Sequence, residues 1–571
     1  MKRKKILFIL LLVNTFSSFA QPASTSSADK KFEGKNGAVV SAHALASQAG
    51  LDMLLQGGNA VDAAIATQLA LAVVYPGAGN LGGGGFMVAV LKSGKTIALD
   101  YRETAPASAF KDMYLDDAGN PVTLSSIQGP LASGIPGTVA GLFASMKYAQ
   151  LPFKKLIAPA IELAKKGFTI SAAQAESFNE NKATFTANNR NPIAFIKNTE
   201  WKEGDLLIQP ELAQTLTLIR SKGAKGFYRG KTARLITKEM KSGKGIINLK
   251  DLKNYKVKER TAIRFPYKQF EIISMPLPSS GGILLQQMMK MIEHRNIASM
   301  GFGSAESVQL MTEVERRAFA DRGTYMGDAD FVKVPVKTLV SDAYLQQRMY
   351  DYKPGKAGNS QQTKEGQIKE SEETTHISVV DKEGNAVSVT TTLNGSYGSN
   401  TVVSGAGFLL NNEMDDFSVK PGVANMYGAL GNANNAIAPG KRMLSSMTPT
   451  IVLKDGKPYL VVGTPGGTTI PTSVFQTLVN LLEFNMSAAD AVNKPKFHHQ
   501  WLPDEVAVEK DFAESVKEQL KAMGYDIKER GAIGRTEVIQ VKNTSATTIR
   551  TIIAVGDKRG DDDARGYTPI P

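Results

Sequence analysis

Cysteine is absent from this 571-residue sequence, and histidine occurs only five times. The chain therefore forms no disulfide bond, has no thiolate metal site and cannot use a cysteine nucleophile. The adjacent pair His498 and His499 could suggest a metal ion, but so few potential ligands favour structural histidines. The sequence has no G-x-S-x-G motif, which disfavours a conventional serine hydrolase. We expect neither a metal nor a cofactor.

Aromatic residues are also scarce, at 7% of the chain, whereas Lys and Arg exceed Asp and Glu by 13 charges. Four of the positive charges lie in residues 2–5, so +9 remains for the rest of the chain. The Lys and Arg residues are spread along the sequence rather than gathered in blocks. This distribution indicates a solvated basic surface and argues against a nucleic-acid-binding protein.

Long apolar runs are missing too. The sequence begins with four basic residues at positions 2–5, continues with an apolar run over positions 6–13, and reaches Ser18-Phe19-Ala20. This order is typical of a cleavable signal peptide, here residues 1–20. The apolar run is too short to span a bilayer. We therefore predict an exported protein, periplasmic or secreted, without a membrane span.

The most informative stretch joins a polar segment to an alternating one. Between Tyr352 and Ile368 there is no Val, Leu, Ile, Phe or Met, so residues 353–373 are predicted to form a flexible tether. From Thr374 onward apolar and polar residues alternate, residues 381–385 (DKEGN) turn the chain, and the alternation resumes. This pattern predicts a β-hairpin.

A threonine at the head of a core strand suits one kind of chemistry. Its hydroxyl is a poor nucleophile until a base removes the proton, and a free α-amine on the same residue, with a pKa of about 7.7–8.0, can be that base. The amine exists only if the bond between Glu373 and Thr374 is cut. One hypothesis is therefore a precursor that cleaves itself there. The alternative is a polar loop that leads into an ordinary threonine-rich hairpin.

Residues 374–398 (TTHISVVDKEGNAVSVTTTLNGSYG) closely resemble the signature of the γ-glutamyltranspeptidases, members of the N-terminal-nucleophile hydrolase superfamily. Further blocks extend the resemblance over nearly the whole chain after the leader. It implies an α+β fold, a four-layer αββα sandwich built jointly from a large subunit (residues 21–373) and a small subunit (residues 374–571). The two subunits would remain associated as a heterodimer because they share the core.

The resemblance also implies a two-step acyl transfer. Thr374 would attack the γ-amide carbonyl of glutathione or a related γ-glutamyl compound. The γ-glutamyl ester would then pass to water or to an acceptor amino acid or dipeptide. Thr392 would hydrogen-bond the hydroxyl of the nucleophile. In the block GTPGGTT, Gly466 and Gly467 would form the oxyanion hole, where glycine lets backbone N–H groups approach a developing charge.

Three residues are assigned by the same resemblance to the α-carboxylate of the γ-glutamyl donor. Arg102 lies in the block DYRETAP, and a guanidinium meets a carboxylate through two parallel hydrogen bonds. Ser445 and Ser446 lie in the block RMLSSMTPT and would contribute their hydroxyl groups.

The donor's α-ammonium group would be held by Asn394 and Asp416, with Glu413 as a weaker contact. Residues 421–440 are rich in Gly, Asn and Pro and resemble the lid of many family members, with Tyr427 as its gate. Closing this lid would limit water and influence the entry of the acceptor.

A glycine-rich run at residues 77–85 raises another possibility, because residues 77–82 (GAGNLG) formally match G-x-G-x-x-G. The pattern predicts a helix before this run and a strand after it, the reverse of a dinucleotide-binding unit. We therefore interpret the glycines as a place of tight backbone packing.

Two rival functions stay open. A related acylase of the cephalosporin or glutaryl type would share the nucleophile but accept acyl groups that lack the ammonium, and Asn394 together with Asp416 argues against it. An exported amino-acid-binding protein would keep the pocket without being cleaved, and it would show one intact chain without γ-glutamyl turnover.

Overall fold

The computed structural model describes residues 30–362, 374–420, 422–423, 425–426, 432–543 and 550–568. The predicted signal peptide, Glu373 and Tyr427 lie outside the described residues. Within these ranges, no helix has both the length and the apolar character needed to cross a membrane.

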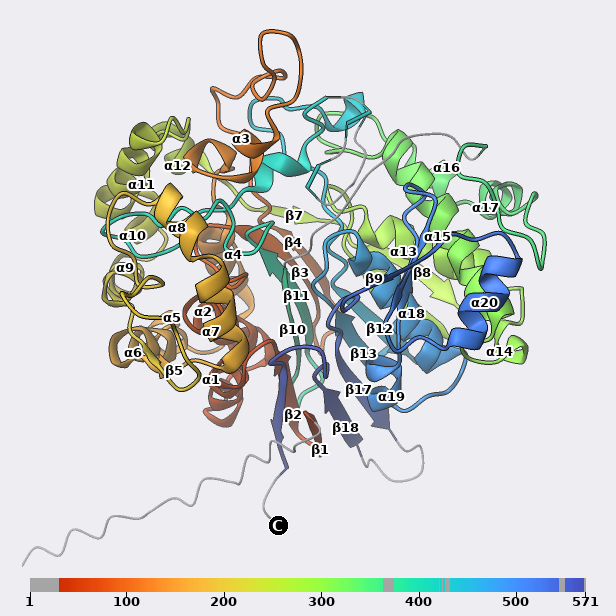
Figure 1. Cartoon of the computed structure of the whole chain (residues 1–571). Coiled ribbons are helices and arrows are strands. Elements are labelled where there is room, and N and C mark those ends of the chain that lie inside the picture. Colours follow the sequence, from red (N-terminus) through yellow and green to blue (C-terminus); the bar gives the residue numbers. More distant parts are fainter. Residues whose placement is uncertain are drawn as a thin grey trace, which may run out of the picture.

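Two seven-stranded antiparallel sheets lie face to face at the centre of the molecule (Figure 1). In order across the first sheet, the strands are β19 (Asp563–Tyr567), β2 (Gly37–Ser41), β10 (Thr375–Val380), β11 (Ala386–Thr392), β3 (Gly84–Val90), β4 (Thr96–Asp100) and β7 (Lys258–Arg260). The second sheet runs β1 (Lys31–Gly34), β18 (Arg550–Val555), β17 (Glu537–Asn543), β13 (Lys457–Gly463), β12 (Thr450–Lys454), β9 (Phe270–Ser274) and β8 (Ile263–Tyr267). Both sheets combine strands from before and after Thr374.

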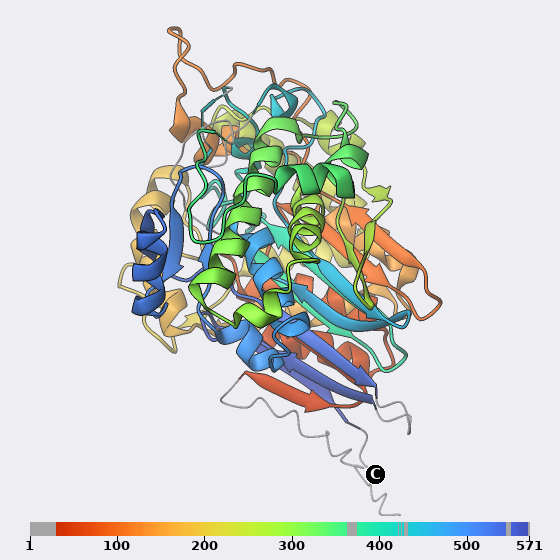
Figure 2. The same cartoon turned by 90° about the vertical axis from the view of Figure 1, so that its right-hand side faces the viewer.

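Helices cover the outer face of each sheet. On the first sheet, α1 (Ala44–Leu55) and α2 (Ala60–Val74) pack against β10 and β11 in one apolar cluster. On the second, α13 (Gly281–Ile292), α15 (Ala305–Tyr325) and α18 (Thr469–Leu482) form another cluster, on the side that faces the viewer in Figure 2. A third cluster fills the space between the two sheets. The predicted αββα sandwich is confirmed.

The predicted hairpin is present as β10 and β11. Its turn is closed by the N–H of Asp381, which donates to the carbonyl of Asn385 at 3.1 Å, and Gly384 adopts the left-handed φ of +90° that glycine tolerates best. The apolar residues Ile377 and Val389 are paired and face the helices. The polar residues of the alternation face the second sheet rather than water, so every residue of both strands is buried.

The glycine-rich run packs against backbone, as predicted. A Cβ atom on Gly82 would lie 2.1 Å from the carbonyl oxygen of Leu409, and one on Gly83 would lie 2.0 Å from that of Thr392. Helix α2 precedes the run and strand β3 follows it, which is the order expected from the sequence. The run therefore allows two neighbouring segments to approach more closely than any side chain would permit.

The described part of the predicted tether, residues 353–362, is held against the body of the protein by hydrogen bonds. Gln309 donates to the carbonyl of Lys353 at 3.0 Å, and the N–H of Ser360 donates to Asp504 at 2.8 Å. The indole of Trp501 donates to the carbonyl of Ser360 at 3.1 Å. These contacts hold the described part of the segment in place as far as Ser360.

Candidate active site

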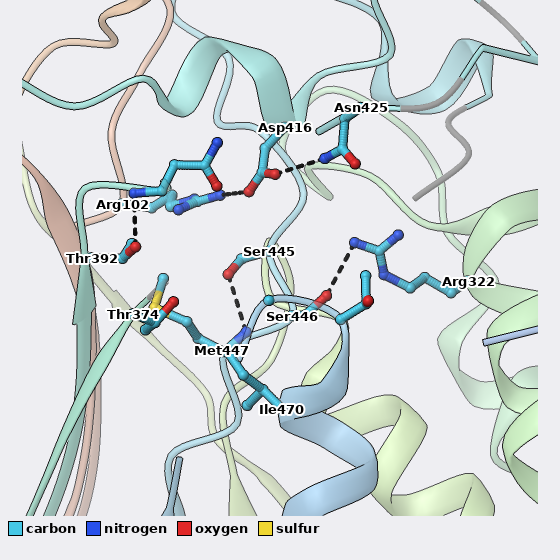
Figure 3. Close-up of a pocket in the computed structure, with 13 residues that line it drawn as sticks. Arg102, Arg322, Thr374, Thr392, Asp416, Asn425, Ser445, Ser446, Met447 and Ile470 are labelled. Atoms are coloured by element: carbon cyan, nitrogen blue, oxygen red, sulfur yellow. Dashed lines mark hydrogen bonds and ion pairs between the residues drawn. The ribbon is translucent and has the colours of Figure 1, made fainter. Parts of the chain in front are cut away.

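A pocket opens where the end of the β10–β11 hairpin meets the N-terminus of α18 and the segment before β12 (Figure 3). It encloses about 330 Å³ of space, part of it open to solvent. Residues from both sides of position 374 line it: Arg102, Arg322, Thr374, Thr392, Asn394, Asp416, Asn425, Ser445, Ser446, Met447, Gly467, Thr468 and Ile470. Eight of the eleven predicted site residues are in this set.

The two predicted threonines lie at the open end of the hairpin. Thr375 pairs with Thr391, which brings Thr374 and Thr392 next to each other at the edge of the pocket (Figure 3). The Oγ1 atom of Thr392 accepts a hydrogen bond from the N–H of Asn394 at 2.8 Å. Asn394 has a φ of +76°, a left-handed conformation that Asn adopts more readily than most other residues. This bend turns the chain away from β11 and along the pocket wall.

The two predicted glycines precede α18 and are separated from it by Thr468. Their φ angles are +133° for Gly466 and +53° for Gly467, both in the region that favours glycine. Gly467 lines the pocket, and the carbonyl of Gly466 accepts from the N–H of Thr469 at 2.9 Å. The N-terminus of a helix carries unsatisfied N–H groups and partial positive charge, so this edge of the pocket suits a developing oxyanion.

Arg102 follows β4 and is buried, with 1% of its side chain exposed. Its guanidinium forms ion pairs with Glu413 and Asp416, and Nη1 lies 3.8 Å from Glu103. Its backbone N–H donates to Asp100 at 3.0 Å, which fixes the residue at the end of the strand. Burial opposes the charge of Arg102, but the carboxylates of Glu413 and Asp416 outweigh it and raise the pKa of the guanidinium.

Three carboxyl groups therefore surround one guanidinium. Burial raises the pKa of Glu103 to about 8 and raises the pKa of Glu413 well above its ordinary value, while Arg102 opposes both shifts. Burial also raises the pKa of Asp416, whose Oδ1 accepts from Asn425 at 2.9 Å. Of the three carboxyl groups, Asp416 lines the pocket. Glu413, expected to be a weaker contact of the donor's ammonium, is paired with Arg102 and is not among the lining residues. Asp416 is therefore the carboxyl group of this cluster that a ligand in the pocket can reach.

The two serines lie on the opposite wall. Ser445 Oγ accepts from the N–H of Met447 at 3.2 Å, and Ser446 Oγ accepts from Arg322 at 3.2 Å. The backbone of Ser445 is held by residues 278–280, because its N–H donates to Pro278 at 2.9 Å and its carbonyl accepts from Ser280 at 2.8 Å. The loop before α13 thus supports this wall of the pocket.

Five lining residues were not among the predicted site residues: Arg322, Asn425, Met447, Thr468 and Ile470. The side chains of two of them, Arg322 and Asn425, donate hydrogen bonds to predicted site residues. Arg322 lies on α15, and no local pattern in the sequence separates it from the ion-paired arginines of that helix, Arg316 and Arg317. Asn425 lies in the predicted lid, and its contact with Asp416 links the described part of that segment to the pocket.

The described residues include no group of three or more His, Asp or Glu side chains that could hold a metal ion. The His498 ring is hydrogen-bonded to Thr472 at 2.8 Å and to Gln500 at 2.9 Å. The ring of His499 lies 3.4 Å from Asp504, and burial lowers the pKa of His499 to about 4. Both rings thus have partners within the protein.

Comparison with known proteins identifies relatives over most of the chain. The family model described as gamma-glutamyltranspeptidase matches residues 46–567. The glutathione hydrolase proenzyme of Escherichia coli (strain K12) is 48% identical over 512 residues, which cover 89% of this chain and 88% of that protein.

Solved structures give the same relationship. The gamma-glutamyltranspeptidase of Helicobacter pylori is 46% identical, with a TM-score of 0.56, over 56% of this chain and 93% of that chain. The cephalosporin acylase from Bacillus halodurans has a TM-score of 0.80 over 97% of this chain and 99% of its own, but it is only 24% identical and so supports the fold alone. From the match of the family model and the identity with the Escherichia coli protein, we conclude that this chain belongs to the gamma-glutamyltranspeptidase family.

Proposed function

We propose that this chain is the precursor of a γ-glutamyltransferase and glutathione hydrolase with Thr374 as its nucleophile. The observation that carries the proposal is the meeting of Thr374, a buried guanidinium, a pocket-lining carboxylate and the glycine-rich start of α18 in one pocket. Family membership supplies the reaction class, and this pocket supplies a chemical group for each of its steps.

In the first step, Thr374 Oγ1 attacks the γ-carbonyl carbon of the donor while the α-amine of Thr374 takes the hydroxyl proton. The N–H groups at Gly466 and Gly467 stabilise the oxyanion. When the C–N bond breaks, the proton passes to the leaving amine, which is cysteinylglycine if the donor is glutathione. In the second step, water or the amine of an acceptor amino acid or dipeptide attacks the ester and regenerates Thr374.

The head group of the donor carries one positive and one negative charge, and the pocket has partners for both. Arg102, Ser445 and Ser446 bind the α-carboxylate, and Asp416 and Asn394 bind the α-ammonium. In the structure without ligand, Arg102 and Asp416 are paired with each other. The zwitterionic head of the donor inserts between these two side chains. Arg102 then pairs with the α-carboxylate and Asp416 with the α-ammonium, so neither protein charge is left buried without a partner. Glu413 acts through Arg102, and Tyr427 gates the lid.

We further propose that residues 1–20 direct export to the periplasm or the medium and that cleavage before Thr374 yields subunits of residues 21–373 and 374–571. The relative from Escherichia coli is named a proenzyme, which supports processing. The first sheet contains β2, β3, β4 and β7 from one subunit and β10, β11 and β19 from the other. Shared sheets of this kind would keep the two subunits together as a heterodimer.

The test is to purify the full chain, separate it on a denaturing gel, and determine the N-terminal sequence of the smaller band. We expect that band to begin Thr-Thr-His-Ile and the preparation to hydrolyse γ-glutamyl-p-nitroanilide. Thr374→Ala should remain a single inactive chain. Thr375→Ala, which changes the adjacent buried threonine of β10, is the matched control and should still be cleaved.

Two results would overturn the proposal. Turnover of the anilide by a preparation that remains one intact chain would exclude an N-terminal threonine nucleophile. A single intact and inactive chain, with a pocket that still binds glutamate, would favour the amino-acid-binding protein.

A further inference from the structure

Arg322 lies in the last turn of α15 and points into the pocket beside the serine wall (Figure 3). It is buried, with 7% of the residue exposed. Its Nε donates to Ser280 Oγ at 3.1 Å, and its Nη2 donates to Ser446 Oγ at 3.2 Å. The guanidinium of Arg322 thus contacts Ser446, a predicted carboxylate-binding serine, and Ser280, whose loop holds the backbone of Ser445.

The other buried arginines of α15 have a different environment. Arg316 pairs with Glu313 and Asp504, and Arg317 pairs with Glu313 and Asp351. Arg322, in contrast, donates hydrogen bonds to two serine hydroxyls, those of Ser280 and Ser446. Burial lowers the pKa of Arg322 to about 10, with Asp416 as an opposing influence, so the group still carries its charge at neutral pH. A buried cation at the pocket wall favours an anionic ligand.

The contact with Arg322 also determines whether the Ser446 hydroxyl acts as donor or acceptor toward a ligand. A guanidinium has donors only, so Ser446 Oγ must accept this hydrogen bond and direct its own O–H elsewhere. Ser445 Oγ is in the same position, because it accepts from the N–H of Met447. Both serines line the pocket, so both are set to donate to an acceptor there, and a carboxylate is such an acceptor.

We propose that Arg322 is a positioning residue that determines specificity for the α-carboxylate of the donor, by fixing Ser446 as a hydrogen-bond donor and adding a second positive charge to that end of the pocket. This inference rests on the proposed function. Arg102 contacts the carboxylate directly, whereas Arg322 acts through Ser446 and through its charge.

The experiment compares two donors that differ only in the carboxylate, γ-glutamyl-p-nitroanilide and 4-aminobutyryl-p-nitroanilide. In Arg322→Met, kcat/KM for the first should fall about 10- to 100-fold, the range expected for losing a hydrogen bond to a charged group. Most of this loss should be in KM. The second donor should be little affected, so the ratio of the two values falls. Arg322→Lys, which keeps the charge, should recover part of the ratio.

Inhibition constants of L-glutamate and 4-aminobutyrate give the same comparison for binding alone, without turnover of a poor donor. Arg316→Met is the matched control, because it removes another buried arginine from the same helix, one that is paired away from the pocket. It should leave both ratios unchanged. If Arg322 acts through Ser446, then Arg322→Met and Ser446→Ala should be less than additive.

The inference is overturned if Arg322→Met and Arg322→Lys lower kcat/KM for both donors by the same factor. It is also overturned if they change neither the ratio of the kcat/KM values nor the ratio of the inhibition constants. If Arg322→Met does not fold, Arg322→Lys still decides the matter: it must lower the ratio of the two kcat/KM values, and its effect must be less than additive with that of Ser446→Ala. The proposed function fails separately, through absence of γ-glutamyl turnover in the unaltered protein.

Discussion

Asp416 offers the sharpest test of how the pocket selects its donor. The carboxylate lines the pocket, pairs with Arg102 and accepts from Asn425 at 2.9 Å. Asp416→Asn keeps the size and most of the hydrogen-bonding capacity of the side chain but removes its negative charge. If Asp416 binds the α-ammonium of the donor, this substitution leaves that ammonium without its ionic partner.

The expected size of the effect follows from the burial of the site. Losing one partner of a buried, hydrogen-bonded charge pair costs about 2–5 kcal/mol, and each 1.4 kcal/mol is a factor of ten. The value of kcat/KM for γ-glutamyl-p-nitroanilide should therefore fall roughly 30- to 4,000-fold. Glutaryl-p-nitroanilide has the carboxylate but no ammonium, so its turnover should hold or rise. The variant would move toward the specificity of a glutaryl acylase.

The assay measures kcat/KM for both anilides in the processed enzyme, with Asp415→Asn as the control. Asp415 is the adjacent buried acid, but it accepts from Ser126 at 2.6 Å and from the N–H of Met426 at 2.7 Å and does not line the pocket. Asp415→Asn should therefore leave the ratio of kcat/KM for the two donors unchanged. A parallel fall for both donors in Asp416→Asn, or the same switch in Asp415→Asn, would refute the reasoning.

Three other predictions concern the nucleophile, the glycine run and pH. Thr392→Val should lower kcat roughly 10- to 100-fold without changing the fold, because it removes a hydroxyl beside the nucleophile; unchanged kcat would contradict the assigned role. Gly83→Ala should destabilise the protein by about 1–3 kcal/mol, because its Cβ would lie 2.0 Å from the carbonyl of Thr392; in Gly77→Ala the nearest atom is 3.6 Å away, and Tm should hold. Burial raises the pKa of Asp562 to about 6, so the stability that its protonated form contributes is complete below about pH 4 and is lost as pH rises through 6. The advantage of Asp562→Asn over the unaltered protein should therefore grow between pH 4 and pH 7, by up to about 3 kcal/mol in the free energy of unfolding, and a rising difference in Tm would report it. A difference in Tm that stays constant would show that Asp562 does not titrate in this range.

The hairpin could be predicted because its signals are local. The alternation from Thr374 and the turn at residues 381–385 lie within one short stretch. The order of the strands in the sheet could not be predicted in this way, since Ile377 pairs with Ser41, more than 300 residues away. The alternation of apolar and polar residues also does not show whether the polar face of the hairpin contacts water or another part of the protein. His376 is buried between the sheets, where it bonds Thr390 at 2.9 Å and where burial lowers its pKa to about 3.

The residues of the candidate site likewise divide into those that local sequence motifs indicate and those that only the fold brings to the pocket. Residues embedded in long motifs, such as Thr374 and Gly467, could be named from the sequence, and the structure brings them into one pocket. Arg322 could not, because Arg316 and Arg317 on the same helix carry the same charge for structural reasons. Whether an arginine on such a helix meets a carboxylate or a pocket depends on which segment packs beside it, and that is settled only by the fold.

The position of the nucleophile in the sheet explains why a cut before it is compatible with a rigid active site. Strand β10 lies between β2 and β11, and both neighbours are paired with it over most of its length. Thr374 directly precedes the first residue of this strand, so its position is fixed by strand pairing that does not depend on the bond to residue 373. Cleavage there, as proposed, would convert the amide nitrogen of Thr374 into an amine at the end of a strand that is paired with both of its neighbours. Preorganisation of this kind lets the newly formed base act without a further conformational step.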